Sequence, residues 1–228
     1  MTKLYKVEVT VNGEITDDDV LYGFKAAHDN ASTGRRLLVW FTTQKTSTSN
    51  DVAWDDTRVA FVTQPRKRDK DTITSYHSEL LDYGSEYLVE SRSGGGHTIH
   101  YDDPTHMAVH NISEKDLRVG LMAYVAVAGE KLTARHHCEN PLPKNVTTTF
   151  RAVEKILLFL GDSPEERKLE PGNPVDTALS GGILIDASAA DPEDLRVAFD
   201  TTTREWSWDG GAWARLVQAG EYLPSFTS

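Results

Sequence analysis

The sequence predicts an all-β protein with antiparallel β-sandwich architecture and little helix. Short runs of β-branched and aromatic residues recur along the whole chain, and glycine-rich or polar turn segments separate them at the spacing typical of sandwiches. Residues 117–127 carry apolar side chains on both faces of a strand, which is typical of a strand in the middle of a protein. Both halves of the chain show this pattern, so two packed sandwiches also fit the length of 228 residues.

The first predicted strand covers residues 4–11, where the side chains alternate at period two and an Asn-Gly turn follows. For residues 16–28 the sequence does not decide between two secondary structures. Thr16 and the aspartates after it resemble the first turn of a short helix, whereas the apolar alternation from Val20 onward fits a strand.

Further strands are predicted where β-branched and aromatic residues cluster. They cover residues 36–43, 58–63, 72–77, 86–91 and 98–101. The polar stretch 44–51 is expected to be a flexible loop between the first two of them. The buried strand at residues 117–127 then turns at residues 128–131 into a partner strand over residues 132–137.

A domain boundary is predicted at residues 139–144, where two prolines stand among polar residues. It divides the chain into a β-rich N-terminal domain of residues 1–140, which carries all eight histidines, and a β-rich C-terminal domain of residues 145–228. A single larger β domain is the alternative.

In the C-terminal part, residues 146–160 favour one long strand over a helix because isoleucine, leucine and phenylalanine are frequent there. Short strands are predicted at residues 183–186 and 195–199. The segment from Trp206 to Trp213 has the strand–turn–strand pattern of a hairpin.

The composition excludes several classes of protein. A formal net charge of −11 repels phosphate backbones and anionic lipid, and residues 65–70 form the one short basic run, so no nucleic-acid partner is predicted. Cys138 is the single cysteine, which excludes an intrachain disulfide. The N-terminal segment does not resemble a signal peptide, and no transmembrane segment is predicted. We therefore expect a cytoplasmic protein, or one released without a signal peptide.

Three tryptophans near the C-terminus form the first candidate site. Trp206 and Trp208 share one face of a predicted strand, and Trp213 follows across the turn. Exposed indole rings stack on sugars and other flat ligands. The sequence therefore offers Trp206, Trp208 and Trp213 as ligand-binding residues, with core packing as the competing interpretation.

The histidines form the second candidate site, because six of the eight fall within residues 97–137. The predicted metal ligands are His100, His106, His110 and His136, with Asp102 and Asp103 as supporting carboxylates. The ion would be a divalent metal: zinc, copper, iron or calcium.

The spacing of the histidines weakens the metal hypothesis. A strand would separate His106 from His110 by about 13 Å, too far for one shared ion. A helix beginning at Asp103 would bring them one turn apart, but the residues after His106 are mediocre helix formers. Surface or hydrogen-bonded histidines at strand ends are the favoured interpretation.

The leading functional hypothesis is a non-enzymatic binding protein whose loops and tryptophan hairpin recognise a carbohydrate, another small molecule or a protein partner. It rests on the lack of a nucleotide-binding loop, a nucleophile elbow and a compact metal motif. The alternative is a metal-dependent enzyme with a histidine site around residues 97–137. A pore-forming or membrane-surface protein ranks last, because no lipid-facing stretch is evident.

Overall fold

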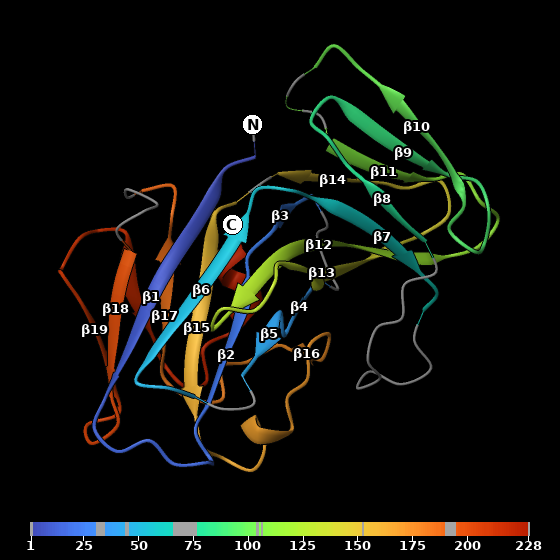
Figure 1. Cartoon of the computed structure of the whole chain (residues 1–228). Coiled ribbons are helices and arrows are strands. Elements are labelled where there is room, and N and C mark those ends of the chain that lie inside the picture. The colour runs from blue at the N-terminus through green and yellow to red at the C-terminus, as the bar shows by residue number, and fades with distance from the viewer. Residues whose placement is uncertain are drawn as a thin grey trace.

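The computed structural model describes residues 2–30, 35–43, 46–65, 77–103, 105, 107–151, 153–189 and 195–227. It confirms the all-β prediction, since the described residues form twenty strands and two short 3₁₀ turns, arranged in three packed and mostly antiparallel sheets (Figure 1). The two turns are η1 (Glu166–Lys168) and η2 (Leu223–Thr227). Among the described residues, no helix has the length and apolar character needed to cross a membrane.

The first sheet, which we call the large sheet, has ten strands, eight of them in the order β16-β4-β13-β12-β6-β1-β18-β19. These are β16 (Pro174–Val175), β4 (Arg36–Leu38), β13 (Thr133–Leu142), β12 (Leu117–Val127), β6 (Ser49–Asp55), β1 (Leu4–Asn12), β18 (Leu195–Asp200) and β19 (Glu205–Trp208). Strand β7 (Val59–Thr63) pairs with β12 and with β8 (His77–Leu80).

The second sheet, which we call the inner sheet, has the order β20-β17-β15-β2-β5. Its strands are β20 (Ala214–Val217), β17 (Gly182–Asp186), β15 (Lys155–Gly161), β2 (Val20–Lys25) and β5 (Phe41–Thr42). Both faces of its middle are covered. Along β15, Ile156 and Leu158 pack into one core cluster while Leu157 and Phe159 pack into the other, and all four are fully buried.

The third sheet, which we call the small sheet, has the order β10-β9-β11-β14-β3, and its strands β9, β10 and β11 lie at the upper right of Figure 1. Its strands are β10 (Gly96–His100), β9 (Ser85–Val89), β11 (Met107–Asn111), β14 (Thr147–Arg151) and β3 (His28–Asp29).

Strand β12 joins the two core clusters, as its burial on both faces predicts. Residues 118–122 pair with β7, and Leu117, Val119 and Leu121 pack in one cluster with residues of the small sheet. Residues 125–127 pair with β6, and the end of β12 packs in the other cluster with the inner sheet. One long strand therefore runs through both cores of the molecule.

The structure decides one open alternative and corrects one prediction. In the segment left open between helix and strand, residues 20–25 and 28 are in strands, and Leu21, Tyr22 and Phe24 are buried on opposite faces of β2, where a one-sided helix would not bury them. The stretch 44–51, expected to be a loop, contains the start of β6. The alternating side chains of β6 explain this difference, since Asn50, Val52 and Trp54 are buried while Asp51 and Ala53 between them are only half-buried.

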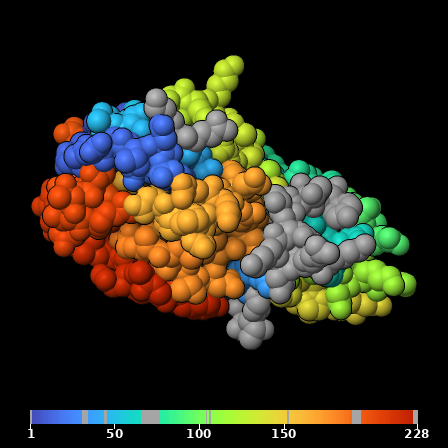
Figure 2. All heavy atoms as spheres, turned by 90° about the horizontal axis from the view of Figure 1, so that it is seen from below, coloured from blue at the N-terminus to red at the C-terminus, as the bar shows by residue number. Residues whose placement is uncertain are grey.

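The segments expected near the domain boundary also differ from the structure. Residues 139–142 belong to β13, and the long strand expected at 146–160 is divided between β14 and β15, which lie in different sheets. Strands from the two sides of the boundary pair with each other: β1 with β18, β2 with β15 and β11 with β14. Figure 2 shows the blue N-terminal segments lying against the orange and red C-terminal ones. The two predicted domains therefore share sheets, and whether the chain divides near residue 140 or forms a single larger β domain stays a prediction.

Candidate functional site

Three breaks in the strands come together where the small sheet diverges from the rest of the molecule. The first break follows Lys25, the last residue of β2. The second lies between β6 and β7 and contains Arg58, and the third ends at Glu154, just before β15. The first and last of these breaks are joined by a hydrogen bond of 2.9 Å from the Ala26 amide to the Lys155 carbonyl. We call this junction the seam. Each break contributes one charged side chain to it: Lys25, Arg58 and Glu154.

These three side chains form a buried ionic network. Lys25 Nζ lies 2.8 Å from Glu154 Oε2, and Arg58 Nη2 donates to Glu154 Oε1. Trp54 Nε1 also donates to Glu154 Oε2, at 3.1 Å. The exposed fractions of the lysine, arginine and glutamate side chains are 1%, 5% and 10%. Charges this deeply buried persist only when they are paired and hydrogen-bonded, and the Glu154 carboxylate satisfies that condition.

Aromatic rings enclose the ammonium group of Lys25. Its Nζ lies 5.8 Å from the centroid of Trp40 and 5.7 Å from that of Trp54, which are cation–π distances. Tyr5 stacks on the outer side of Trp54 with 5.4 Å between ring centroids. The Trp40 indole is held in place by its hydrogen bond of 3.1 Å to the Ala123 carbonyl. The rings fix the position of Lys25 and exclude water from it.

His137 reaches the seam because of a β-bulge. In the β12–β13 pairing, Met122 opposes His136 and Leu121 opposes Cys138, so His137 is the extra residue. Its ring is buried, and Nδ1 donates a proton to the Lys25 carbonyl at 3.2 Å. Burial holds the pKa of His137 well below its usual value, and the charges of Lys25 and Arg58 act in the same direction. The imidazole is therefore neutral.

The pKa values of the buried ionic groups Lys25 and Glu154 are also shifted. Burial lowers the pKa of Lys25 to about 8, even though the Glu154 carboxylate favours the charged form. For Glu154, burial alone would raise the pKa, but Lys25 first and then Arg58 hold it below the usual glutamate value. Glu154 is thus a carboxylate shared by two cations, and the network carries one more positive than negative charge.

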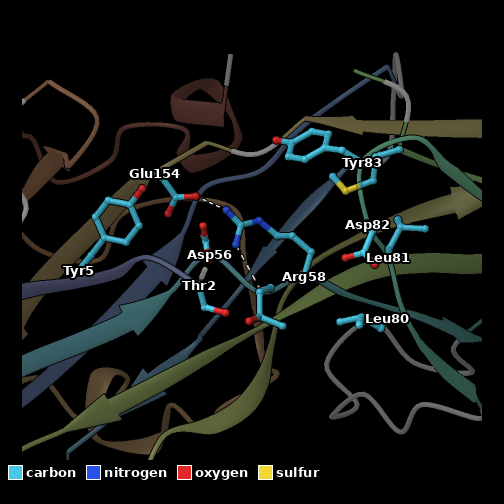
Figure 3. A pocket seen from close by; sticks show the side chains of 11 residues that line it. Thr2, Tyr5, Asp56, Arg58, Leu80, Leu81, Asp82, Tyr83 and Glu154 are labelled. Carbon is cyan, nitrogen blue, oxygen red and sulfur yellow. Dashed lines mark hydrogen bonds and ion pairs between the residues drawn. The ribbon is translucent and has the colours of Figure 1, made fainter. Parts of the chain in front are cut away.

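A pocket of about 540 Å³ opens over this network (Figure 3). Arg58 lies in the middle of it with its guanidinium directed at Glu154, Tyr5 stands on the side of Glu154, and Leu80, Leu81, Asp82 and Tyr83 form the opposite wall. The complete lining is Thr2, Tyr5, Asp56, Thr57, Arg58, Leu80, Leu81, Asp82, Tyr83, Met107 and Glu154.

The tryptophans predicted to bind a ligand lie away from this pocket. Trp206 and Trp213 are buried, with exposed fractions of 5% and 8%, and Trp206 packs in the core, where its ring centroid lies 5.1 Å from that of Phe199. The segment from Trp206 to Trp213 is not a hairpin, because β19 pairs with β18 in the large sheet and β20 pairs with β17 in the inner sheet. It bridges two sheets instead.

All three indole N–H groups are bonded within the protein. Trp206 Nε1 donates to the Gly181 carbonyl at 3.3 Å, and Trp208 Nε1 donates to the Gly211 carbonyl at 2.8 Å. Trp213 Nε1 donates to Asp209 Oδ1 at 3.2 Å. Half-buried Trp208 still lines a shallow hollow with Arg196, Ser207 and Asp209. The structure thus leaves Trp208 a surface role and places Trp206 and Trp213 mainly in packing.

The histidines predicted to bind a metal are dispersed. His106 lies outside the described residues. His100 and His110 stand on β10 and β11, which flank β9 on opposite sides, and they oppose Ser85 and Leu88. His136 is on the large sheet, where its ring lies edge-on to Phe61 with 4.5 Å between centroids. The structure does not bring these three together.

The carboxylates predicted to support the metal do not change this picture. Asp102 and Asp103 are exposed after β10, and Asp103 Oδ1 accepts hydrogen bonds from the amide and hydroxyl of Thr105. His110 has a different carboxylate neighbour, Glu86, at 3.6 Å. Within the part of the chain that the structure describes, no three histidine, cysteine, aspartate or glutamate side chains are placed to hold a metal ion. Zinc, copper, iron or calcium therefore stays a prediction without a located site.

Sequence reasoning missed Lys25, Arg58 and Glu154 as site residues. One signal was available: Lys25 stands between Phe24 and two alanines at the end of an apolar run, where a charged side chain needs a buried partner. Nothing local marks Arg58 or Glu154, which become neighbours only through strand pairing. Comparisons with models of known protein families, with curated proteins and with solved structures find no match to this chain.

Proposed function

We propose that this is a non-enzymatic binding protein that holds a carbohydrate or similar polyhydroxylated small molecule in the seam pocket. The observation that carries the proposal is the combination of a rigid, charged floor with an apolar and tyrosine-bearing wall in one pocket. A volume of about 540 Å³ lies within the ordinary range for small-molecule sites.

The floor of the pocket is preorganised. Glu154 accepts hydrogen bonds from Lys25, Trp54 and Arg58, so neither it nor Arg58 is free to rotate when a ligand arrives. A site whose polar groups are already fixed loses little conformational entropy on binding. The same three bonds stabilise the carboxylate form of Glu154, which argues for recognition by this pocket rather than for proton transfer.

The remaining lining groups suit a sugar. The carboxylates of Asp56 and Asp82 accept hydrogen bonds from hydroxyl groups, and the Arg58 guanidinium donates to ring and hydroxyl oxygens. The apolar C–H face of a sugar ring fits against Tyr83 and Leu80, whose side chains are about half exposed, at 51% and 53%.

The test is isothermal titration calorimetry with a panel of methyl glycosides on the intact protein and on three variants. Tyr83→Ala is expected to lower the affinity about tenfold, because it removes the stacking surface. Tyr222→Ala is the matched control: its side chain is 57% exposed and does not line the pocket. Trp208→Ala tests the competing tryptophan site.

Unchanged affinity in the Tyr222 and Trp208 variants, with a loss in the Tyr83 variant, would support the seam pocket. No binding of any glycoside, or a loss confined to Trp208→Ala, would contradict the proposal.

A further inference from the structure

The buried network under the pocket is short of negative charge. Lys25 and Arg58 share the single carboxylate of Glu154, and all three side chains are at least nine-tenths buried. The depressed pKa of Lys25 has burial as its largest cause and Arg58 as a further one, while Glu154 and then Asp55 act in the opposite direction. The carboxylates of Asp56 and Asp82, which also line the pocket, offset the surplus positive charge for the site as a whole, so an anionic group is favoured only where it contacts Arg58 directly.

Arg58 can receive such a group. Its guanidinium carries five N–H donors in a planar fork. Two acceptors are visible, Glu154 Oε1 and the Thr57 carbonyl at 3.2 Å, and the other donors find no acceptor among the described residues. Arg58 is 5% exposed and lines the pocket, so the surface it does show faces the ligand space. A guanidinium edge in this position matches a carboxylate.

The rest of the lining constrains what else the ligand carries. Asp56 Oδ1 accepts the Lys3 amide at 2.9 Å, and within the described part of the chain the Asp82 carboxylate has no hydrogen-bond donor. Two carboxylates facing the pocket repel a bare anion but accept hydroxyl groups. A ligand that suits Arg58, Asp56 and Asp82 together therefore has a carboxylate on one side and hydroxyl groups on the other.

We infer, building on the proposed carbohydrate-binding function, that the ligand of the seam pocket is an acidic sugar whose carboxylate pairs with Arg58. Its hydroxyl groups bond to Asp56 and Asp82, and its C–H face lies on Tyr83. The preference for an acidic over a neutral sugar comes from direct pairing of its carboxylate with Arg58.

Matched sugars test this preference directly. Calorimetry would compare methyl glucoside, methyl glucuronide and methyl glucosaminide, which share a ring and differ in charge, together with the galactose series. The uronide is expected to bind about tenfold or more tightly than its neutral counterpart, as for a charge-assisted hydrogen-bonded pair. Equal affinity for the uronide and the neutral glycoside, or tighter binding of the amino sugar, would overturn the acidic-sugar inference while leaving carbohydrate binding intact. No binding of any sugar would contradict the proposed function itself.

Variants locate the source of the preference. Arg58→Gln leaves Lys25 and Glu154 as a balanced pair. Because Arg58 also donates to the ring and hydroxyl oxygens of the sugar, the variant is expected to weaken binding of the neutral glycoside as well, but to weaken uronide binding more, so that the uronide preference is lost. Asp82 is an exposed residue of the pocket wall. Asp82→Asn keeps an acceptor oxygen and removes one charge that repels the uronide, so uronide affinity should rise about threefold. A uronide preference retained in Arg58→Gln, or uronide affinity that is unchanged or lower in Asp82→Asn, would overturn the assignment.

Discussion

The seam and the tryptophan segment are both rich in aromatic rings, yet they are built in opposite ways. The rings of Trp206, Trp208 and Trp213 come from one short stretch of chain, and their N–H groups bond to the backbone or to a nearby aspartate. At the seam, Trp54 and Trp40 surround charges that come from separate strand breaks.

The difference shows what makes a residue available for function. Aromatic side chains that complete their own hydrogen bonds and pack in a core have little left to offer a ligand, however conspicuous they are in the sequence. Arg58 is inconspicuous in the sequence, but it keeps unused donors at the floor of a pocket.

Removing the shared carboxylate should have the largest effect on stability. Glu154→Gln leaves Lys25 and Arg58 as buried cations without an anionic partner, and we expect the free energy of unfolding to fall by about 3–5 kcal/mol. Urea denaturation followed by circular dichroism measures it. A loss below about 1 kcal/mol would show that another group compensates the buried charges of Lys25 and Arg58.

Substitutions in the tryptophan segment should lower the free energy of unfolding by less, and by an amount that depends on how deeply each ring is buried. Trp206→Phe removes the donor to the Gly181 carbonyl and reduces core packing, so we expect a loss of about 2 kcal/mol in the free energy of unfolding. Trp208→Phe, at a half-buried site, should cost less than about 1 kcal/mol. Equal losses in the two variants, measured by the same denaturation, would mean that both rings are core residues.

His137 should make the seam sensitive to mild acid. Its pKa is lowered in the folded protein, so below pH 6.5 the unfolded chain binds a proton that the folded protein does not. Stability must then fall as the pH falls, by about 1 kcal/mol between pH 6.5 and 5.5. Glu154 also has a lowered pKa, but its contribution is lost only near and below the ordinary glutamate value.

Denaturation curves at the two pH values check this prediction, with His137→Asn as the control. The variant should lose most of the dependence on pH between 6.5 and 5.5. A slope that persists in His137→Asn would assign the acid sensitivity to another group.

The sequence was sufficient for the fold class but not for the pairing of strands. The alternation of side chains in residues 4–11 predicted β1, and the apolar residues on both faces of residues 117–127 predicted β12, because side-chain periodicity is a local property. The parallel pairing of β1 with β18 joins residues that are far apart in the sequence, such as Val7 and Leu195, and no local pattern encodes it.

The candidate site was missed for the same physical reason. Tryptophan and histidine attract attention by residue type, whereas Lys25, Arg58 and Glu154 are common residues whose role comes from their positions at three separate strand breaks. The bulge that turns His137 inward is a further example: regular alternation puts neighbouring histidines on opposite faces, and only the paired strand shows which residue is the extra one.

Indole N–H signals test directly whether the ligand binds in the seam pocket or at the tryptophan segment. Protein labelled with ¹⁵N at its tryptophans gives an indole N–H signal for each of the five rings, assigned by single Trp→Phe variants. On titration with a uronide, we expect the Trp54 signal to shift, because that N–H bonds to Glu154 at the pocket floor, and the signals of Trp206, Trp208 and Trp213 to stay in place. Shifts at Trp208 with an unmoved Trp54 signal would contradict binding in the seam pocket.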